Sequence, residues 1–321
     1  MEIYGTLGPA CANAAVLEQM FRSGMTGLRL NLSHTSLEES APLLEQMHLA
    51  AERCGVRPQL LIDLQGPELR VGKQGLPLLL EEGVRLPLRR LALPEHLYAA
   101  LQPETELLLD DGRLCVRVLP AGEGLVLRGG TLAPGKSVAV PGLCAALPAL
   151  TAADRKNLSL ASAFGVTGVM QSFVRSREDV EEVRTALCGT GLRHFAKLEN
   201  RAGLDSLEQW IRLPDVLVIA RGDLGNAVPL WELPGVQKQV AALARQAGKP
   251  FLVVTQMLAS MERTAVPTRA EVSDIFNAVL DGASALMLTG ETAAGRYPAE
   301  AMDYFCRTIR AAETFLREER N

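Results

Sequence analysis

The sequence predicts an α/β protein, a TIM-type (β/α)8 barrel with a small β-barrel lid domain inserted after the third strand. Short apolar, branched runs alternate with amphipathic stretches over most of the 321 residues. Eight such runs occur, and eight parallel strands is the number that closes into a barrel. Residues 72–139 break the alternation and resemble short strands joined by Gly, Pro and acidic turns. An open doubly wound sheet is the alternative, because periodicity alone does not distinguish it from a barrel.

The expected strands, in chain order, are residues 3–7, 27–32, 59–63, 166–173, 193–199, 215–221, 250–256 and 284–290. Helix-start signals follow several of them. Ser36 with Glu39 and Thr268 with Glu271 have the spacing of capping boxes, and Thr151 precedes an acidic residue in a first turn. Ser176 likewise precedes an acidic residue in an expected first turn. The glycines expected where helices stop are Gly24, Gly191 and Gly282.

The insertion sets the expected domain boundaries. Residues 1–71 and 140–321 would form the barrel, and residues 72–139 would form the β domain. Because the insertion interrupts a loop between a strand and the following helix, it would lie over the barrel mouth as a lid.

Composition narrows the class of protein. The chain is 48% hydrophobic and 22% charged with a net charge of -4, and it contains no dense basic run, so a nucleic-acid surface is not expected. No apolar run is long enough to span a bilayer. The six cysteines lack CxxC spacing, and the first residues, MEIYGTLGPA, do not resemble a signal peptide. These features predict free thiols and a cytoplasmic location.

Polar side chains gather at the carboxyl ends of the expected strands. In GLRLNLSHT (27–35), polar residues alternate with leucines, so they occupy one face of a strand. Inward side chains at this end of a barrel reach the active-site mouth. The residues in such positions are Arg29, Asn31, Ser33, Asp63, Ser172, Lys197, Glu199, Asp223, Thr255 and Glu291.

The residue types indicate chemistry on a phosphorylated substrate. Glu199 and Asp223 close adjacent strands, and two carboxylates with waters and substrate oxygens are the usual ligands of Mg²⁺. Lys197 would place a positive charge beside that metal, and Arg29 and Arg70 are suited to bind phosphate. Such a set suits phosphoryl transfer or stabilisation of an enolate.

A second, oxygen-rich cluster of Asn31, Ser33 and Asp63 would suit a monovalent cation, although such clusters also occur as hydrogen-bonded strand ends. Purely structural roles are alternatives for several of the other candidate residues. Lys197 could form an ordinary ion pair with Glu199, and Arg29 could pair with Asp63. The alternatives for two further features are turn chemistry in ARGDLG (220–225) and a buried, unreactive Cys11.

The chain resembles pyruvate kinases along essentially its whole length. The motifs that carry the resemblance include TLGPA, LRLNLSH, DLQGPELR, LLLDDG, QSFVRSREDVEEVR, AKLENRAG, VIARGDLG, GKPFLVVTQMLASM and PTRAEVSDIFNAVLDGASALMLTGETAAGRYP. The resemblance implies a barrel interrupted after its third strand by a lid. It also implies phosphoryl transfer between phosphoenolpyruvate and ADP, giving pyruvate and ATP through a Mg-stabilised enolate.

The resemblance assigns roles residue by residue. Glu199 and Asp223 would hold Mg²⁺ or Mn²⁺, Lys197 would stabilise the phosphoryl group during transfer, and Arg29 and Arg70 would contact phosphates. Ser172 and the backbone of Gly222 and Asp223 would place phosphoenolpyruvate. The residues near the enolate would be Thr255, which lies on the route of proton delivery, with Thr289 and Glu291 behind it.

The same resemblance implies that K⁺ is held by Asn31, Ser33, Asp63 and the carbonyl of Leu64. Glu68 favours potassium dependence, because members that need no potassium usually have lysine there.

The departures from the family lie at the C-terminus and on the nucleotide side. The family's usual C-terminal domain is missing from the sequence, which ends near Arg320. Thr35, Glu39 and Ala139 replace a glycine, an aromatic residue and an asparagine of the family. The nucleotide-binding positions that remain are Thr6, Pro9, His34 and Lys136.

Two alternatives therefore stay open beside a pyruvate-kinase-like phosphotransferase. One is an enzyme of the same family that uses a different phosphoryl acceptor or performs lyase chemistry. The other is a non-catalytic phosphoenolpyruvate sensor. The expected partners are phosphoenolpyruvate or pyruvate and ADP or ATP, without nucleic acid or membrane, and the expected assembly is a homodimer.

Overall fold

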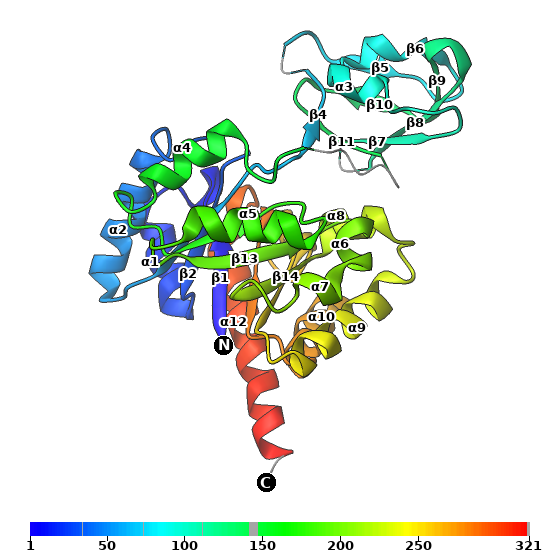
Figure 1. The fold of residues 1–321 in the computed structure, drawn as a ribbon. Helices are drawn as coiled ribbons and strands as arrows, with labels where there is room; N and C mark the ends of the chain where they lie inside the picture. The colour runs from blue at the N-terminus through cyan, green and yellow to red at the C-terminus, as the bar shows by residue number, and fades with distance from the viewer. Residues whose placement is uncertain (34, 73, 111, 141–146, 320–321) are drawn as a thin grey trace.

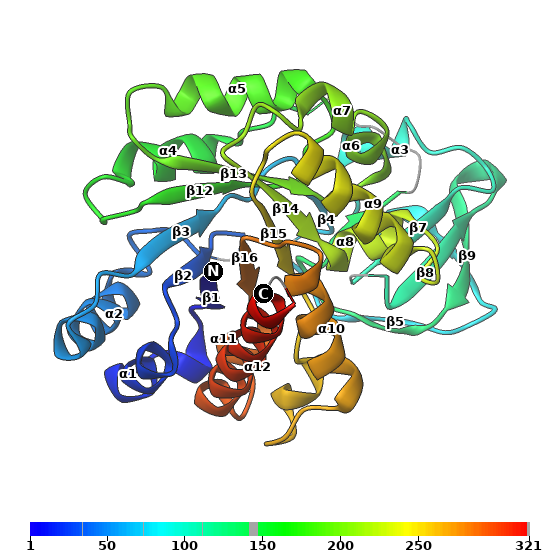
Figure 2. The same ribbon diagram turned by 90° about the horizontal axis from the view of Figure 1, so that it is seen from below.

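The chain folds into a closed barrel of eight parallel strands surrounded by helices (Figures 1 and 2). The structure is a computed structural model that describes residues 1–33, 35–72, 74–110, 112–140 and 147–319. The strands are β1 (Glu2–Thr6), β2 (Gly27–Asn31), β3 (Gln59–Asp63), β12 (Gly168–Gln171), β13 (Arg193–Leu198), β14 (Val216–Ala220), β15 (Phe251–Val254) and β16 (Ala285–Met287). Because β1 pairs with both β2 and β16, the barrel prediction is confirmed and the open-sheet alternative is wrong.

The helices pack their apolar faces on the outward side chains of the strands. They form the ring around the strands that Figure 2 shows from below. Their bounds are α1 (Ala14–Ser23), α2 (Ala41–Cys54), α4 (Ala152–Leu160), α5 (Arg177–Leu187), α6 (Arg201–Asp205), α7 (Leu207–Trp210), α8 (Arg221–Ala227), α9 (Leu233–Gln246), α10 (Arg269–Leu280), α11 (Gly290–Ala293) and α12 (Pro298–Glu318), with 3-10 turns η1 (Pro9–Cys11) and η4 (Ala259–Glu262).

The expected helix signals are found with small differences in position. Thr268 and Glu271 form a capping box at the start of α10. Ser36 and Glu39 exchange the same two hydrogen bonds, of 3.2 Å and 2.9 Å, but around a turn, because α2 begins only at Ala41. Among the predicted helix stops, Gly24 caps α1 directly, whereas Gly191 and Gly282 come shortly after the last residues of α5 and α10.

The barrel interior has three layers. Along each strand, inward and outward side chains alternate, and the inward ones change character from bottom to top. In β13 the sequence of inward residues is Arg193, Phe195 and Lys197, and in β3 it is Gln59, Leu61 and Asp63. The middle layer is an apolar core that includes Tyr4, Leu61, Met170, Phe195, Val218 and Leu252.

The bottom layer is closed by hydrogen bonds. The Tyr4 hydroxyl donates to Glu2 at 2.8 Å, and Arg193 Nη1 lies 2.7 Å from the Glu2 carboxylate and 3.0 Å from Gln59 Oε1. This network satisfies the polar groups at the amino ends of three strands. The apolar middle layer separates this network from the polar groups of the top layer, which lie at the carboxyl ends of the strands.

The insertion, residues 69–139, projects from the end of the barrel at which the strands finish (Figure 1). Its strands make a six-stranded antiparallel sheet in the order β4-β11-β7-β8-β9-β6 and a two-stranded sheet, β10-β5. Their bounds are β4 (Leu69–Arg70), β5 (Leu78–Leu80), β6 (Arg85–Pro87), β7 (Glu106–Leu109), β8 (Leu114–Val118), β9 (Glu123–Arg128), β10 (Gly130–Leu132) and β11 (Ser137–Ala139), with short turns η2 (Leu88–Leu91), α3 (Glu95–Tyr98) and η3 (Pro120–Gly122).

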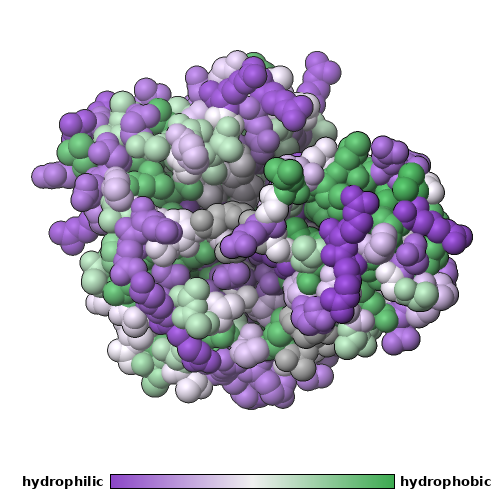
Figure 3. All heavy atoms as spheres, turned by 90° about the horizontal axis from the view of Figure 1, so that it is seen from above, coloured by the Kyte–Doolittle hydropathy of each residue, from purple (hydrophilic) through white to green (hydrophobic). Residues whose placement is uncertain are grey.

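The surface of the insertion is partly apolar. Figure 3, which looks down on this end, shows hydrophobic surface gathered on the right, where the insertion lies. Leu76 is 92% exposed, and Leu79 and Val84 are exposed as well.

Within the described ranges, no helix combines the length and the apolar character needed to cross a membrane. Each described cysteine is a free thiol, as expected, and Cys144 lies outside the described residues.

Candidate active site

A cavity of about 220 Å³ opens at the carboxyl ends of the strands. It brings together most of the side chains that the sequence analysis placed at strand ends. Its cations are Arg29, Arg70 and Lys197, and its acids are Asp63, Glu68, Glu199 and Asp223. The neutral polar residues on its wall are Asn31, Ser33, Ser172, Thr255 and Thr289. Residues from seven different strand ends or loops therefore face one small volume.

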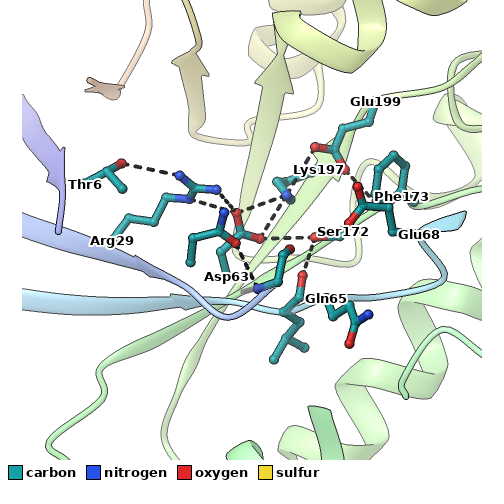
Figure 4. Close-up of polar contacts among 12 residues, drawn as sticks. Thr6, Arg29, Asp63, Gln65, Glu68, Ser172, Phe173, Lys197 and Glu199 are labelled. Carbon is teal, nitrogen blue, oxygen red and sulfur yellow. Dashed lines mark hydrogen bonds and ion pairs between the residues drawn. The ribbon is translucent and has the colours of Figure 1, made fainter. Parts of the chain in front are cut away.

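An ion-pair network occupies the centre of this cavity (Figure 4). Lys197 Nζ lies 2.9 Å from Asp63 Oδ1 and 3.1 Å from Glu199 Oε1. Arg29 Nη2 lies 2.6 Å from Asp63 Oδ2, and its Nε donates to the same oxygen at 2.8 Å. All four side chains are largely buried. The two ion pairs expected as structural alternatives thus both exist, but as part of one network inside the cavity.

The network fixes the charges of its members. Burial alone would raise the pKa of Asp63, but Lys197 and Arg29 outweigh burial and hold that pKa below its ordinary value. Burial would likewise lower the pKa of Lys197, but Asp63 and Glu199 raise it to about 12. Lys197 is therefore an ammonium at neutral pH. Glu199 differs, because burial keeps its pKa above the ordinary value despite the neighbouring Lys197.

Glu199 and Asp223 bring two carboxylates to the same cavity. Both face the same cavity, and Glu199 Oε2 is held by the backbone N–H of Phe173 at 2.7 Å. Within the part of the chain that the structure describes, no three His, Cys, Asp or Glu side chains cluster as a complete metal site. Two carboxylates leave coordination positions for water and substrate oxygens, so this donor set fits Mg²⁺ or Mn²⁺.

Three of the four residues expected to bind K⁺ lie on the wall of the cavity. Asn31, Ser33 and Asp63 line the cavity, while Leu64 does not. Asn31 Oδ1 accepts from the Ser33 N–H at 3.1 Å, and the Leu64 carbonyl accepts from the Ser172 hydroxyl at 2.5 Å. Since Ser172 also contacts Asp63 at 3.1 Å, the Leu64 carbonyl and Asp63 lie at one corner of the cavity, and Asn31 is the neighbour of Asp63 on the adjacent strand. Oxygen donors with a single formal charge fit a monovalent cation.

Glu68 and Arg70 form a further ion pair, separate from this network, at 2.7 Å. Arg70 Nη1 also donates to the carbonyl of Gly135 at 2.8 Å, on the strand connection that leads to β11. Burial raises the pKa of Glu68, which Arg70 lowers only in part. The pair therefore couples the rim of the cavity to the insertion.

Thr255 stands on a strained turn. The backbone angle φ is 82° at Thr255 and 54° at Gln256. A positive φ is unfavourable for a β-branched residue such as threonine. Arg221 holds the turn, because its Nη2 donates to the Thr255 carbonyl at 2.8 Å and its Nη1 lies 2.7 Å from Asp274 Oδ2. The sequence alone indicates only turn chemistry for Arg221. Its distance in sequence from Thr255 and Asp274 explains why this contact was missed.

Two other predicted catalytic residues, Thr289 and Glu291, lie at the end of β16. Thr289 lines the cavity, while Glu291 is buried and turned toward the backbone. The Glu291 carboxylate accepts from the N–H groups of Leu258, at 3.0 Å, and of Thr289, at 2.7 Å. Gly222 approaches closely, since a Cβ there would lie 3.0 Å from Thr255 Cγ2.

The residues assigned to nucleotide binding are dispersed around the cavity. The Thr6 hydroxyl accepts from Arg29 Nη1 at 3.4 Å, and Pro9 begins η1 nearby. Lys136, in the insertion, pairs with Asp110 at 2.6 Å. His34 lies outside the described residues. None of the described three is among the residues that line the cavity.

A second cavity, of about 390 Å³, adjoins the first between the barrel and the insertion. Leu108 and Val138 line it from the insertion, and Val140 lines it just after β11. Glu199 and Asp223 border both cavities, so the two open on the same pair of carboxylates. No sequence signal pointed to it, because its walls come from segments far apart in the chain.

Comparison with known proteins agrees with this architecture. The family described as "Pyruvate kinase, barrel domain" matches residues 1–87 and 91–302. A pyruvate kinase of Methylorubrum extorquens is 39% identical, over 97% of this chain and 68% of its own length. A pyruvate kinase of Aeropyrum pernix is 38% identical, over 96% of this chain and 69% of its own length. One of Geobacillus stearothermophilus is 38% identical, over 94% of this chain and 55% of its own length. The chain therefore belongs to the pyruvate kinase family.

Proposed function

We propose that the chain transfers a phosphoryl group between phosphoenolpyruvate and ADP, giving pyruvate and ATP. One observation carries the proposal above the others. A buried ammonium group, Lys197, lies between Asp63 and Glu199 on the wall of a cavity that also holds Asp223 and Arg29. A fixed positive charge beside a pair of metal-binding carboxylates is suited to the charge that develops during phosphoryl transfer.

In this proposal each side chain has one task. Arg29 and Arg70 bind phosphate oxygens, and Ser172 with the backbone of Gly222 and Asp223 orients phosphoenolpyruvate. Mg²⁺ or Mn²⁺, held by Glu199 and Asp223, would supply positive charge next to the oxygens of the substrate. Lys197 stabilises the group in transit. The bond from phosphorus to the enol oxygen breaks, a bond to the terminal phosphate oxygen of ADP forms, and the electron pair remains on the enolate.

Thr255 completes the reaction. Its turn, held by Arg221, presents the residue to the cavity. We infer that Thr255 lies on the route by which a proton from water reaches the methylene carbon of the enolate, with Thr289 and Glu291 behind it. Pyruvate results. K⁺, held by Asn31, Ser33, Asp63 and the Leu64 carbonyl, would add charge near the phosphates, and Glu68 agrees with potassium dependence.

The insertion acts as a lid in this proposal, with residues 72–139 as one domain and residues 1–71 and 140–321 as the barrel domain. A separate apolar core inside the insertion supports the division. Thr6, Pro9, His34 and Lys136 would bind the nucleotide between the two. A homodimer, a cytoplasmic location and a role in glycolysis belong to the same proposal.

A second candidate function keeps phosphoenolpyruvate and changes the acceptor. It rests on the turn at residues 35–39, where the Thr35 hydroxyl lies 3.3 Å from Glu39 Oε2. A negative charge is fixed there, where the resemblance to the family implies a glycine at position 35 and, in some members, an aromatic residue at position 39. Such a turn disfavours a stacked base and its phosphates, so the acceptor would be a different hydroxyl or phosphate compound.

The test is an assay of pyruvate formation from phosphoenolpyruvate and ADP with Mg²⁺ and K⁺, using the wild-type chain and Lys197→Met. We expect turnover in the wild type and a loss of at least about a thousandfold in the variant. Lys238→Met, which removes an exposed lysine paired with Asp281, is the control and should match the wild type. Binding of phosphoenolpyruvate without any turnover would support the sensor alternative. Turnover only with another acceptor would support the second candidate.

A further inference from the structure

Asp154 is a fully buried carboxylate outside the cavity whose hydrogen bonds reach both its own helix cap and a segment nearly ninety residues earlier in the chain. We propose that it is a positioning residue, which ties the chain where it leaves the barrel for the insertion to the chain where it returns, and so holds the loop of Leu64 in a cation-binding conformation. The part about the cation rests on the proposed function. The part about the loop does not.

Four hydrogen bonds converge on this carboxylate. Oδ1 accepts from the N–H of Gln65 at 2.8 Å. Oδ2 accepts from the N–H of Gly66 at 3.1 Å, and from the N–H and the hydroxyl of Thr151 at 2.9 Å and 2.8 Å. Asp154 is 0% exposed, so water cannot replace any of these donors. All four partners donate, as the two oxygens of an ionised carboxylate require.

These partners stand on both sides of the insertion. Gln65 and Gly66 precede β4, which starts at Leu69, and Thr151 follows the return of the chain and caps α4. A capping box alone needs only Thr151 and Asp154. The bonds to Gln65 and Gly66 therefore go beyond helix capping. Through one side chain they connect the segment before the insertion to the segment after it.

The loop that Asp154 holds shapes one corner of the cavity. The Leu64 N–H donates to the Met170 carbonyl at 3.0 Å, and the Leu64 carbonyl accepts from Ser172. Gly66 has a φ of 63°, and a Cβ there would lie 3.0 Å from Ser172 Cβ. The loop is thus fixed on one side by Ser172 and on the other by Asp154. Figure 4 shows Gln65, Ser172 and Asp63 together at this corner.

Asp154→Asn is the most informative substitution, because it keeps the shape of the side chain and replaces one of the two acceptor oxygens with an NH₂ donor. The new NH₂ group would face N–H donors, so at least one bond to the loop is lost. Thr151→Val is the matched control. It removes the capping hydroxyl, while the carboxylate keeps its bonds to Gln65 and Gly66.

The experiment measures three properties of wild type, Asp154→Asn and Thr151→Val in the full chain. Hydrogen–deuterium exchange follows the amides of Gln65 and Gly66, thermal unfolding in KCl against tetramethylammonium chloride follows cation binding, and the pyruvate assay gives the K⁺ concentration for half-maximal rate. In Asp154→Asn we expect exchange at one or both amides at least about tenfold faster, a smaller stabilisation by K⁺ and an about tenfold higher K⁺ requirement. Thr151→Val should leave all three near the wild-type values.

Equal exchange at Gln65 and Gly66 in wild type and Asp154→Asn would overturn the proposal, as would equal effects of the two variants. If Asp154→Asn does not fold, Asp154→Glu, which keeps the charge on a longer side chain, replaces it with the same expectations. A wild type that is stabilised by K⁺ and yet forms no pyruvate would refute the proposed function alone. Exchange and thermal unfolding would then still decide the role of Asp154.

Discussion

Lys197 shows how one residue serves both stability and the proposed chemistry. Its ammonium lies between two buried carboxylates, Asp63 and Glu199. Removal of one partner from a buried ion pair leaves a charge without compensation, which costs about 3–5 kcal/mol. Here Arg29 still pairs with Asp63, so the loss falls mainly on Glu199.

We therefore predict that Lys197→Met lowers the free energy of unfolding by about 3 kcal/mol, measured by urea denaturation at pH 7. Lys238→Met removes an ammonium that is 57% exposed and should cost less than about 1 kcal/mol. Equal losses in the two variants would show that the network around Lys197 does not stabilise the fold.

His194 makes the fold sensitive to acid. It lies on the outer face of β13, where Nε2 is 2.8 Å from Gln171 Oε1, while Nδ1 has no hydrogen-bond partner among the described residues. Burial lowers the pKa of His194 from 6.5 to about 4, since the positive charge of Arg184 adds to burial and Asp215 compensates only in part. The folded chain therefore holds this imidazole neutral.

The expected consequence is a loss of stability between pH 6.5 and pH 4. Because the pKa is lower in the folded than in the unfolded chain, the unfolded chain binds the proton first as the pH falls. Stability is complete above about pH 6.5 and decreases by up to about 3 kcal/mol toward pH 4. Urea denaturation of wild type and His194→Leu at pH 7.5 and pH 5 measures this. The decrease should be about 2 kcal/mol smaller in the variant at pH 5, and parallel curves would contradict the assignment.

The sequence predicted residues on strands better than residues in loops. Arg29, Asp63, Lys197 and Glu199 follow from alternation along a strand, which determines the direction of each side chain. Asp154 has the spacing of a helix cap, but its bond to Gln65 spans 89 positions in sequence. No local pattern contains such a contact, so its role becomes visible only in the folded chain.

At the scale of elements, the eight strands were predicted to within a few residues at their ends. The largest differences are at residues 284–290, of which only Ala285–Met287 form β16, and at residues 166–173, of which only Gly168–Gln171 form β12. Phe173 has a φ of 53°, so the chain turns there although the apolar pattern continues. This turn directs the Phe173 N–H to Glu199. A pattern of hydrophobicity contains no information about such a backbone conformation.

The contact between α8 and the end of β15 gives a prediction for two glycines of one helix. A Cβ at Gly222 would lie 3.0 Å from Thr255 Cγ2, whereas a Cβ at Gly225 would have its nearest neighbour, Leu233 Cδ2, at 3.5 Å. Gly222→Ala should displace Thr255 and lower kcat about tenfold or more. Gly225→Ala should leave kcat unchanged and stabilise the helix by up to about 1 kcal/mol. Steady-state kinetics and urea denaturation compare them, and equal kcat values would remove Thr255 from the chemistry.

At the scale of the whole molecule, the chain contains separate apolar cores. One cluster lies between strands and helices of the barrel, and it includes Leu217. Another lies inside the insertion between Val71 and Val140, includes Leu107, and shares no residue with the first. The sequence predicted the insertion from residue 72, but its sheet already includes β4, because Leu69 and Arg70 pair with Val138 and Ser137. That pairing across the whole insertion has no local signature.

Separate cores predict separate unfolding transitions. Leu107 and Leu217 are both 0% exposed, and truncation of a buried leucine to alanine costs about 2–5 kcal/mol. In scanning calorimetry, Leu107→Ala should lower the transition of the insertion and leave the barrel transition in place, and Leu217→Ala should do the reverse. Hydrogen exchange in β8 and β14 assigns each transition to its core. If both variants shifted one common transition by the same amount, the insertion and the barrel would be a single cooperative unit, and a lid that moves independently of the barrel would be excluded.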